Sequence, residues 1–194
     1  MSSSNPFREK IVLASKSPRR AEILRAVGWE LEASAADVDE TRNPNEDAIS
    51  YVKRVATLKA ETVARRFPGS LVLGADTVVV SGEEILGQPG DDEDARRMLR
   101  LLSGRWHVVL TGVALVRFGN PPRTLVEHAA TRVRFHQMSA DEIDWYVSTE
   151  EPRGKAGAYG IQGRGALFIE GIQGDYFNVV GLPIRLVYDL SRRI

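Results

Sequence analysis

The chain has 194 residues, with 26 Lys and Arg against 26 Asp and Glu, so its formal net charge at pH 7 is zero. Hydrophobic residues make up 43% and charged residues 27%, which is typical of a globular protein and argues against a disordered chain or a coiled coil. The balanced charge argues against a nucleic-acid-binding protein, which would need a basic surface. The chain has no cysteine, which excludes a disulfide scaffold, a thiolate zinc site and a cysteine nucleophile.

The sequence predicts neither a targeting segment nor a membrane span. Its first apolar run, 11–14, is shorter than the apolar region of a signal peptide. The longest apolar stretches, 71–80 and 107–116, have the length of strands and are far shorter than a membrane-spanning helix. We therefore expect a cytoplasmic protein with no membrane partner.

Hydrophobic periodicity and turn residues predict a mixed α/β fold, with residues 1–194 forming a single domain. Ser17 and Pro18 begin the first helix as N-cap and first helical residue, and Gly28 ends it. Ser139 and Glu142 form a capping box that begins a short helix. The expected strands are 10–15, 29–35, 71–80, 106–118, 124–136 and 166–172, and the expected helices are 17–27, 47–67, 91–102, 139–148 and one from 183.

The first candidate site is the segment 14–20, which joins a strand to a helix N-terminus and carries two hydroxyls and three basic residues. Free N–H groups and the positive end of the helix dipole favour an anion there. A well-capped helix with solvated arginines is the alternative, and the local sequence leaves both open.

The second candidate is Asp76, which lies inside the apolar stretch LVLGADTVVV. A carboxylate inside a strand costs several kcal/mol unless it is paired or binds a metal. Its alternative is a bulge or strand end at 74–76 that leaves the carboxylate in water. We favour a functional carboxylate.

Two further candidates would serve a metal and a phosphate. Asp37, Asp39 and Glu40 form an acidic loop whose oxygens suit Mg²⁺ or Mn²⁺, although such loops usually face solvent. Lys59 shares one helix face with Val52, Ala56 and Val63, so its ammonium either points at a bound phosphate or reaches out to water.

The last candidate is the loop 152–165, which has five glycines and carries Gln162. Glycines allow a ligand to approach the backbone, and the amide of Gln162 can both donate and accept a hydrogen bond. The glycine spacing fits neither a P-loop nor a dinucleotide-binding fingerprint, and a flexible surface loop is the alternative. Together, the candidates suggest a polyphosphate ligand and a divalent metal.

Six motifs in this order resemble the Maf family of nucleoside triphosphate pyrophosphatases, over nearly the whole chain from about Ile11. They are ASKSPRR, VDET, ATLKA, GADTVV, GKAGAYGIQG and VVGLP. The resemblance implies the α/β fold of inosine triphosphatases, a long mixed twisted sheet with flanking helices and a cleft between two lobes. It also implies a hydrolase dependent on Mg²⁺ or Mn²⁺ that cleaves a nucleoside triphosphate between the α- and β-phosphates. It allows a homodimer and links the family to septum formation and cell-division arrest.

The resemblance also implies roles for the candidate residues. Asp76 would be either the general base that activates water or a ligand of the metal, and Glu40 would hold the metal. Lys59 and Arg20 would neutralise the triphosphate, with Ser15 supporting the phosphate loop.

Within the family, Arg19, Thr77 and Gln162 match the branch directed at dTTP and UTP, whereas the branch directed at 7-methyl-GTP tends to carry Trp, Gln and Glu there. The amide of Gln162 complements uracil and thymine, which present an N3–H donor flanked by carbonyl acceptors. Modified pyrimidine triphosphates remain open as substrates.

One position departs from the family pattern, because Gln88 stands where members usually carry a lysine. Loss of this cation should weaken phosphate binding, so we expect lowered activity or a shifted preference. The alternative is a nucleotide-sensing regulator of septum formation with little turnover.

Overall fold

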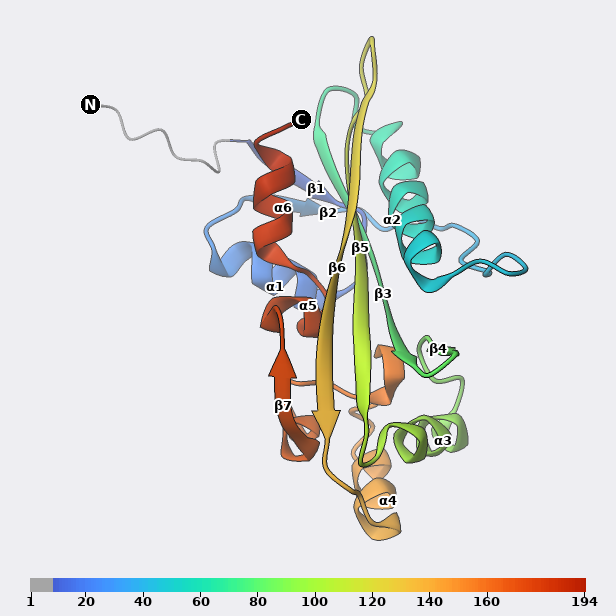
Figure 1. The fold of residues 1–194 in the computed structure, drawn as a ribbon. Coiled ribbons are helices and arrows are strands. Elements are labelled where there is room, and N and C mark those ends of the chain that lie inside the picture. The colour runs from blue at the N-terminus through green and yellow to red at the C-terminus, as the bar shows by residue number, and fades with distance from the viewer. Residues whose placement is uncertain (1–8) are drawn as a thin grey trace. The chain divides into compact units, whose positions relative to one another are not determined.

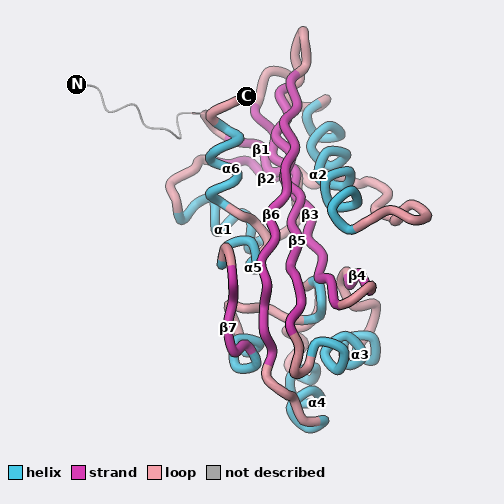
Figure 2. Tube along the Cα trace, viewed as in Figure 1, coloured by secondary structure: helices cyan, strands magenta, loops and turns pink. Residues whose placement is uncertain are grey.

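The computed structural model describes residues 9–194, and the prediction that no signal peptide is present therefore falls partly outside the described residues. Seven strands form one mixed sheet in the order β2-β1-β3-β5-β6-β7, with β4 paired to β3. Figure 2 distinguishes the helices and strands from the loops that connect them. The strands are β1 (Ile11–Leu13), β2 (Leu31–Ala33), β3 (Leu71–Ser81), β4 (Glu84–Leu86), β5 (Trp106–Arg117), β6 (Arg123–Phe135) and β7 (Ile169–Gln173). The helices are α1 (Pro18–Ala26), α2 (Ala48–Ala64), α3 (Asp92–Leu102), α4 (Ala140–Ser148), α5 (Tyr176–Val180) and α6 (Ile184–Ser191), with 3-10 turns at Ala156–Ala158 and Arg164–Phe168.

The described residues divide into two compact units, and the first comprises 9–76, Thr111–His128 and Gly181–Ile194. In this unit β1 pairs in parallel with both β2 and β3. Figure 1 shows α2 on one side of these strands and α1 and α6 on the other. The face of α2 packs against alternate residues of the strands, and this core contains Val12, Ala14, Ala56, Ala60, Val63, Ala64, Val72, Ala114 and Val116.

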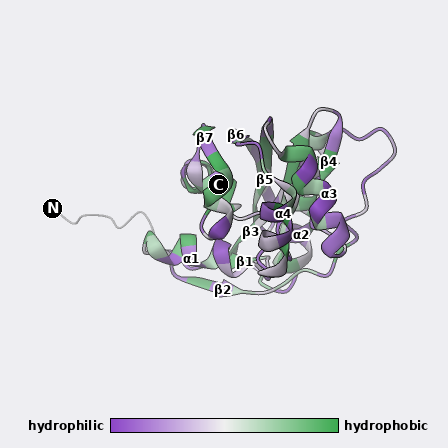
Figure 3. Cartoon of the chain, turned by 90° about the horizontal axis from the view of Figure 1, so that it is seen from below, coloured by the Kyte–Doolittle hydropathy of each residue, from purple (hydrophilic) through white to green (hydrophobic). Residues whose placement is uncertain are grey.

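The second unit comprises Thr77–Leu110 and Ala129–Val180 and has its own apolar core. Here β4 pairs antiparallel with β3, and β7 pairs antiparallel with β6. The buried residues of α3 recur at helical spacing, and Figure 3 shows both hydrophilic and hydrophobic residues on this helix. The core contains Val79, Leu86, Ala95, Met98, Leu99, Leu102, Val109, Val133, Phe135, Met138, Ile143, Tyr146, Val147, Ala158, Tyr159 and Phe168.

The predicted mixed α/β class is confirmed, and most predicted elements are present with their ends shifted by a few residues. Ser17 is the N-cap of α1 with Pro18 following it, and Gly28 comes two residues after the last helical residue with a φ of 82°. The capping box of Ser139 and Glu142 is present. The prediction missed β4 and α5, which are only 3 and 5 residues long. The single-domain expectation remains a prediction.

Within residues 9–194, no helix is both long and apolar enough to cross a membrane.

Candidate active site

The centre of the candidate site is a contact between one ammonium group and two carboxylates, all in the first unit. Lys59 Nζ lies 2.8 Å from Asp76 Oδ1 and 2.8 Å from Glu40 Oε2. The side chains of Lys59 and Asp76 are 11% and 10% exposed, whereas that of Glu40 is 48% exposed. Asp76 is therefore a buried strand carboxylate paired with a cation, as burial of a charge requires. The predicted candidates Asp76, Lys59 and Glu40 come together in space.

Glycine in two neighbouring strands allows α2, which carries Lys59, to lie close to the sheet. A Cβ built on Gly74 of β3 would lie 2.1 Å from the carbonyl oxygen of Ala56, and one on Gly112 of β5 would lie 2.1 Å from that of Val52. Either contact is far too short for a side chain. Only glycine at these positions lets the helix approach the sheet closely enough to bring Lys59 to Asp76.

Arg20 projects from the first turn of α1 and is buried, with 9% of its surface exposed. Its Nε donates to the carbonyl oxygen of Gly181 at 2.9 Å, and its Nη1 donates to Ala75 O at 2.8 Å and to Ser15 Oγ at 3.2 Å. Burial lowers the pKa of Arg20, while the negative charges of Asp76 and Glu40 act to raise it. These contacts bind the guanidinium to the backbone of the residue that directly precedes Asp76.

The hydroxyl of Ser15 also organises the start of α1. Ser15 Oγ accepts a hydrogen bond from the backbone N–H of Ser17 at 3.1 Å, whereas the Ser17 side chain forms no capping hydrogen bond. Arg19, the next residue of this predicted group, is half-buried, and burial lowers its pKa. Thus Ser15 and Arg20 lie in one hydrogen-bonded cluster with the strand that carries Asp76.

The loop that carries Glu40 leads into α2 (pink in Figure 2) and is held by side chains of that helix. The Tyr51 hydroxyl donates to the carbonyl oxygen of Glu40 at 3.0 Å. Arg54 donates to Thr41 O at 3.0 Å and to both carboxylate oxygens of Glu46, at 2.7 and 2.8 Å. Burial, followed by the charges of Asp76 and Glu40, raises the pKa of Tyr51 to about 12. The structure thus adds two positioning side chains that nothing in the sequence pattern had indicated.

The donor chemistry of Glu40 and Asp76 fits a divalent metal ion. Their oxygens lie close to the same ammonium nitrogen, so both carboxylates approach one point. Mg²⁺ is usually held by one or two carboxylates together with substrate phosphates and water, so two protein ligands are sufficient. Among residues 9–194, no group of three or more metal-ligating side chains occurs.

The other two carboxylates of the acidic loop are exposed. Asp39 Oδ1 accepts the backbone N–H of Thr41 at 2.8 Å, and its hydrogen bonds to Thr41 lower the pKa of Asp39. Asp39 therefore stabilises a local turn next to Glu40. Nothing in the described structure gives Asp37 a comparable contact.

The remaining predicted residues, Thr77, Gln88 and Gln162, belong to the second unit. Thr77 directly follows Asp76 on β3 and is half-buried. Gln88 is exposed between β4 and α3, and Gln162 is exposed between the two 3-10 turns. Their roles in binding substrate remain predictions.

A buried histidine of the second unit supports the loop that carries Gln162. His107 is 2% exposed, and its Nε2 lies 2.8 Å from the hydroxyl of Tyr159, which belongs to this loop. Burial lowers the pKa of His107 to about 4, so the imidazole is neutral at pH 7. The edge of its ring also packs against Phe135. Nothing in the sequence pattern indicates this role except the apolar residues on either side of His107.

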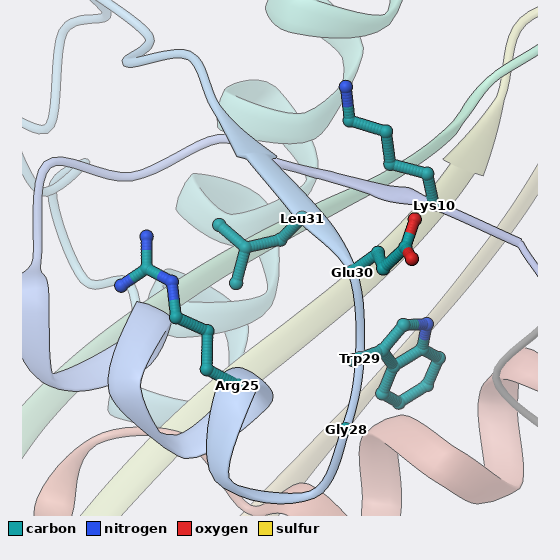
Figure 4. Close-up of a pocket in the computed structure, with 6 residues that line it drawn as sticks. All are labelled: Lys10, Arg25, Gly28, Trp29, Glu30 and Leu31. Atoms are coloured by element: carbon teal, nitrogen blue, oxygen red, sulfur yellow. The ribbon is translucent and has the colours of Figure 1, made fainter.

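A hollow of about 510 Å³ on the first unit lies apart from these residues (Figure 4). It is lined by Lys10, Arg25, Gly28, Trp29, Glu30 and Leu31. None of the predicted site residues lines it, so the candidate site is defined by the side-chain cluster around Lys59.

Solved structures define the fold class to which the chain belongs. It is similar to the HAM1 protein of Coxiella burnetii, with a TM-score of 0.54, 18% identity and coverage of 96% of this chain and 100% of that one. It is also similar to the Ham1 protein of Staphylococcus aureus, with a TM-score of 0.55, 16% identity and coverage of 95% and 99%. These similarities confirm the predicted fold class, a mixed α/β sheet of the Ham1 type with flanking helices.

Sequence comparison identifies the family. Residues 10–194 match the family described as Maf-like protein, and the chain belongs to this family. It is 52% identical to a dTTP/UTP pyrophosphatase of Symbiobacterium thermophilum, over 91% of this chain and 89% of that protein. A dTTP/UTP pyrophosphatase of Myxococcus xanthus is 51% identical over 90% of this chain and 87% of that protein. The predicted family resemblance is thus confirmed.

Proposed function

We propose that this protein is a nucleoside triphosphate pyrophosphatase that hydrolyses dTTP and UTP to the monophosphate and pyrophosphate. The observation that carries the proposal is the contact of Lys59 with Asp76 and Glu40, in a chain whose relatives bear the name dTTP/UTP pyrophosphatase. A buried carboxylate beside an ammonium is the combination that hydrolysis of a phosphoanhydride needs, a proton acceptor next to a cation.

In this proposal, the carboxylate of Asp76 takes a proton from the water that attacks the α-phosphorus. The bond from the α-phosphorus to the bridging oxygen breaks, and pyrophosphate leaves with that oxygen. One oxygen of Asp76 contacts Lys59, which leaves its second oxygen to accept the proton. The ammonium of Lys59 pairs with the carboxylate of Asp76 and offsets the negative charge that develops on the phosphates.

Glu40 would hold the divalent metal ion, Mg²⁺ or Mn²⁺, and Asp76 would share it only where its second oxygen does not accept the proton. When bound, such an ion neutralises phosphate charge and makes pyrophosphate a better leaving group. In the alternative, Asp76 is a metal ligand and takes no part in proton transfer. This alternative predicts that the rate of pyrophosphate release depends on metal concentration more than on pH.

Arg20 acts in this proposal as a positioning residue rather than as a direct phosphate ligand. Its guanidinium donates to the carbonyl oxygens of Ala75 and Gly181, which supports a role in fixing the backbone next to Asp76. Ser15 accepts from the same guanidinium and from the start of α1. Arg19, Thr77 and Gln162 would contact the nucleotide, with Gln162 reading the edge of the pyrimidine base.

The test is to measure pyrophosphate release from dTTP, UTP, CTP, GTP and 7-methyl-GTP, first without metal and then with Mg²⁺ or Mn²⁺. The proposal predicts metal-dependent release concentrated on dTTP and UTP. Equal turnover of the five nucleotides would refute the pyrimidine selectivity. Binding of dTTP without turnover would refute the proposed pyrophosphatase activity and favour the nucleotide-sensing alternative.

A further inference from the structure

The loop from Gly160 to Gly165 holds Gln162 at its centre, and both ends of the loop are fixed by hydrogen bonds. At the first end, the backbone N–H of Gly160 donates to the Tyr146 hydroxyl at 3.1 Å. At the second end, the N–H groups of Arg164 and Gly165 donate to the carboxylate of Glu151 at 2.9 and 3.1 Å. The amide of Gln162 itself is exposed, and among residues 9–194 it has no hydrogen-bond partner.

Both ends of this loop depend on the same carboxylate. The Tyr146 hydroxyl donates to Glu151 Oε1 at 3.0 Å, so the group that accepts from Gly160 is itself oriented by Glu151. Glu151 Oε1 also accepts the N–H of Gly165, and Oε2 accepts that of Arg164. The half-buried carboxylate therefore receives three hydrogen bonds, which is a geometry that a neutral side chain of the same shape cannot reproduce.

The loop is in close contact with this carboxylate. A Cβ built on Gly163 would lie 2.5 Å from Glu151 Oε2, so a side chain directly after Gln162 would displace this carboxylate. Burial raises the pKa of Glu151, but the hydrogen bonds from Arg164, Gly165 and Tyr146 and the charge of Lys155 lower it more. The pKa of Glu151 thus lies below its ordinary value, and the carboxylate is ionised at pH 7.

We propose that Glu151 is a specificity-determining positioning residue, whose carboxylate fixes the loop 160–165 so that the Gln162 amide meets a pyrimidine base in one orientation. This inference rests on the proposed reading of the base by Gln162. Glu151 acts through the loop and touches neither the base nor the phosphates. Its contribution is pre-organisation, since a loop already held in the binding conformation loses less entropy when the nucleotide binds.

The test compares Glu151→Gln with Glu150→Gln in the whole protein. Glutamine at 151 keeps the shape but places an N–H₂ group opposite one of the backbone N–H donors. Glu150 is the matched control, because it loses the same charge from an exposed ion pair with Arg153, a residue that lies outside the segment 160–165. Steady-state kinetics are measured for dTTP and for dCTP, since cytosine lacks the N3–H donor of thymine.

We expect Glu151→Gln to raise the KM for dTTP about 10-fold while kcat stays within about 2-fold, and to reduce the preference for dTTP over dCTP. Glu150→Gln should match the wild type. In the Gln162→Ala background, Glu151→Gln should have little further effect on KM, because the group through which it acts is already lost. An equal effect of Glu151→Gln in both backgrounds, an unchanged KM, or a fall in kcat alone would overturn the proposal.

Two further measurements keep the test independent of folding and of the proposed function. If Glu151→Gln does not fold, Tyr146→Phe removes the hydroxyl shared by Glu151 and Gly160, and it should raise KM and lower selectivity in the same way. Amide hydrogen exchange should show faster exchange within 160–165 in Glu151→Gln and unchanged exchange elsewhere. If wild-type protein hydrolyses no nucleotide, the proposed function fails by itself. If wild-type protein hydrolyses dTTP, and Glu151→Gln and Tyr146→Phe both keep the wild-type preference for dTTP over dCTP, only the proposed role of Glu151 fails.

Discussion

The close packing of α2 against the sheet predicts a large effect for Gly74→Ala, a change of one methyl group. The added Cβ would lie 2.1 Å from Ala56 O, 2.8 Å from Ala60 N and 2.9 Å from Ala60 Cβ. All three contacts belong to the helix that carries Lys59, and two are with backbone atoms that no side-chain rotation can move. The helix must therefore retreat by about 1 Å, which is the overlap that a carbon–oxygen contact of this length has to relieve.

The retreat should cost both stability and activity. Overpacking of a core typically costs about 1–3 kcal/mol, and the backbone contacts here place Gly74→Ala at about 3 kcal/mol. Lys59 directly precedes Ala60, and Asp76 lies two residues after Gly74, so the same shift lengthens their 2.8 Å contact. A displacement of about 1 Å at a catalytic group can reduce the rate about 10²-fold.

Urea unfolding would measure the change in stability, and pyrophosphate release from dTTP would measure the change in activity. Gly171→Ala is the matched control, because this strand glycine of β7 has no atom within 4 Å of a built Cβ. A Gly74→Ala protein with wild-type stability and wild-type activity would refute the claim that this close approach positions Lys59.

Three more predictions follow from the site and from the buried histidine. Lys59→Met keeps the apolar stem of the side chain but removes the ammonium between Asp76 and Glu40, so pyrophosphate release should fall about 10²-fold; an unchanged rate would remove Lys59 from the mechanism. Burial lowers the folded-state pKa of His107 from 6.5 to about 4, so between these pH values the unfolded chain binds a proton that the folded protein does not. When the pH is lowered from 7 to 5, the free energy of unfolding of the wild type should therefore fall by about 2 kcal/mol more than that of His107→Asn. Urea unfolding of both proteins at the two pH values measures this difference, and an equal fall in both would contradict the prediction. Gln88→Lys should raise kcat/KM for dTTP several-fold if the missing cation limits phosphate binding, and an unchanged value would show that it does not.

The sequence was informative where local physics decides the structure. Pro18, Gly28 and the capping box at Ser139 act within their own turn, so their positions predicted helix ends that the structure confirms within a residue or two. Asp76 was recognisable because a charge in an apolar strand requires a partner. Its pairing with Lys59 joins residues 17 positions apart, but the position of Lys59 on the apolar face of its helix already pointed to the sheet.

Contacts that depend on tertiary structure could not be predicted in this way. Glu151 stands next to Glu150 in an ordinary charged stretch, and only the folded loop reveals that one carboxylate accepts three hydrogen bonds while its neighbour forms an exposed ion pair. The short β4 was missed because its 3 residues are too few for a periodic pattern. The role of Arg20 at a phosphate stays a prediction, whereas its donation to Ala75 and Gly181 could not be predicted because it joins segments that are far apart in the chain.

The most direct test of the account is pyrophosphate release from dTTP by Asp76→Asn, measured together with dTTP binding. Asparagine preserves the shape of the side chain but cannot accept a proton as a carboxylate does, so the rate should fall by about 10²–10⁴ while the protein stays folded and still binds dTTP. Asp144→Asn is the matched control, because this carboxylate forms an exposed ion pair with Arg96. Wild-type turnover by Asp76→Asn would contradict the central claim that the buried carboxylate beside Lys59 carries the reaction.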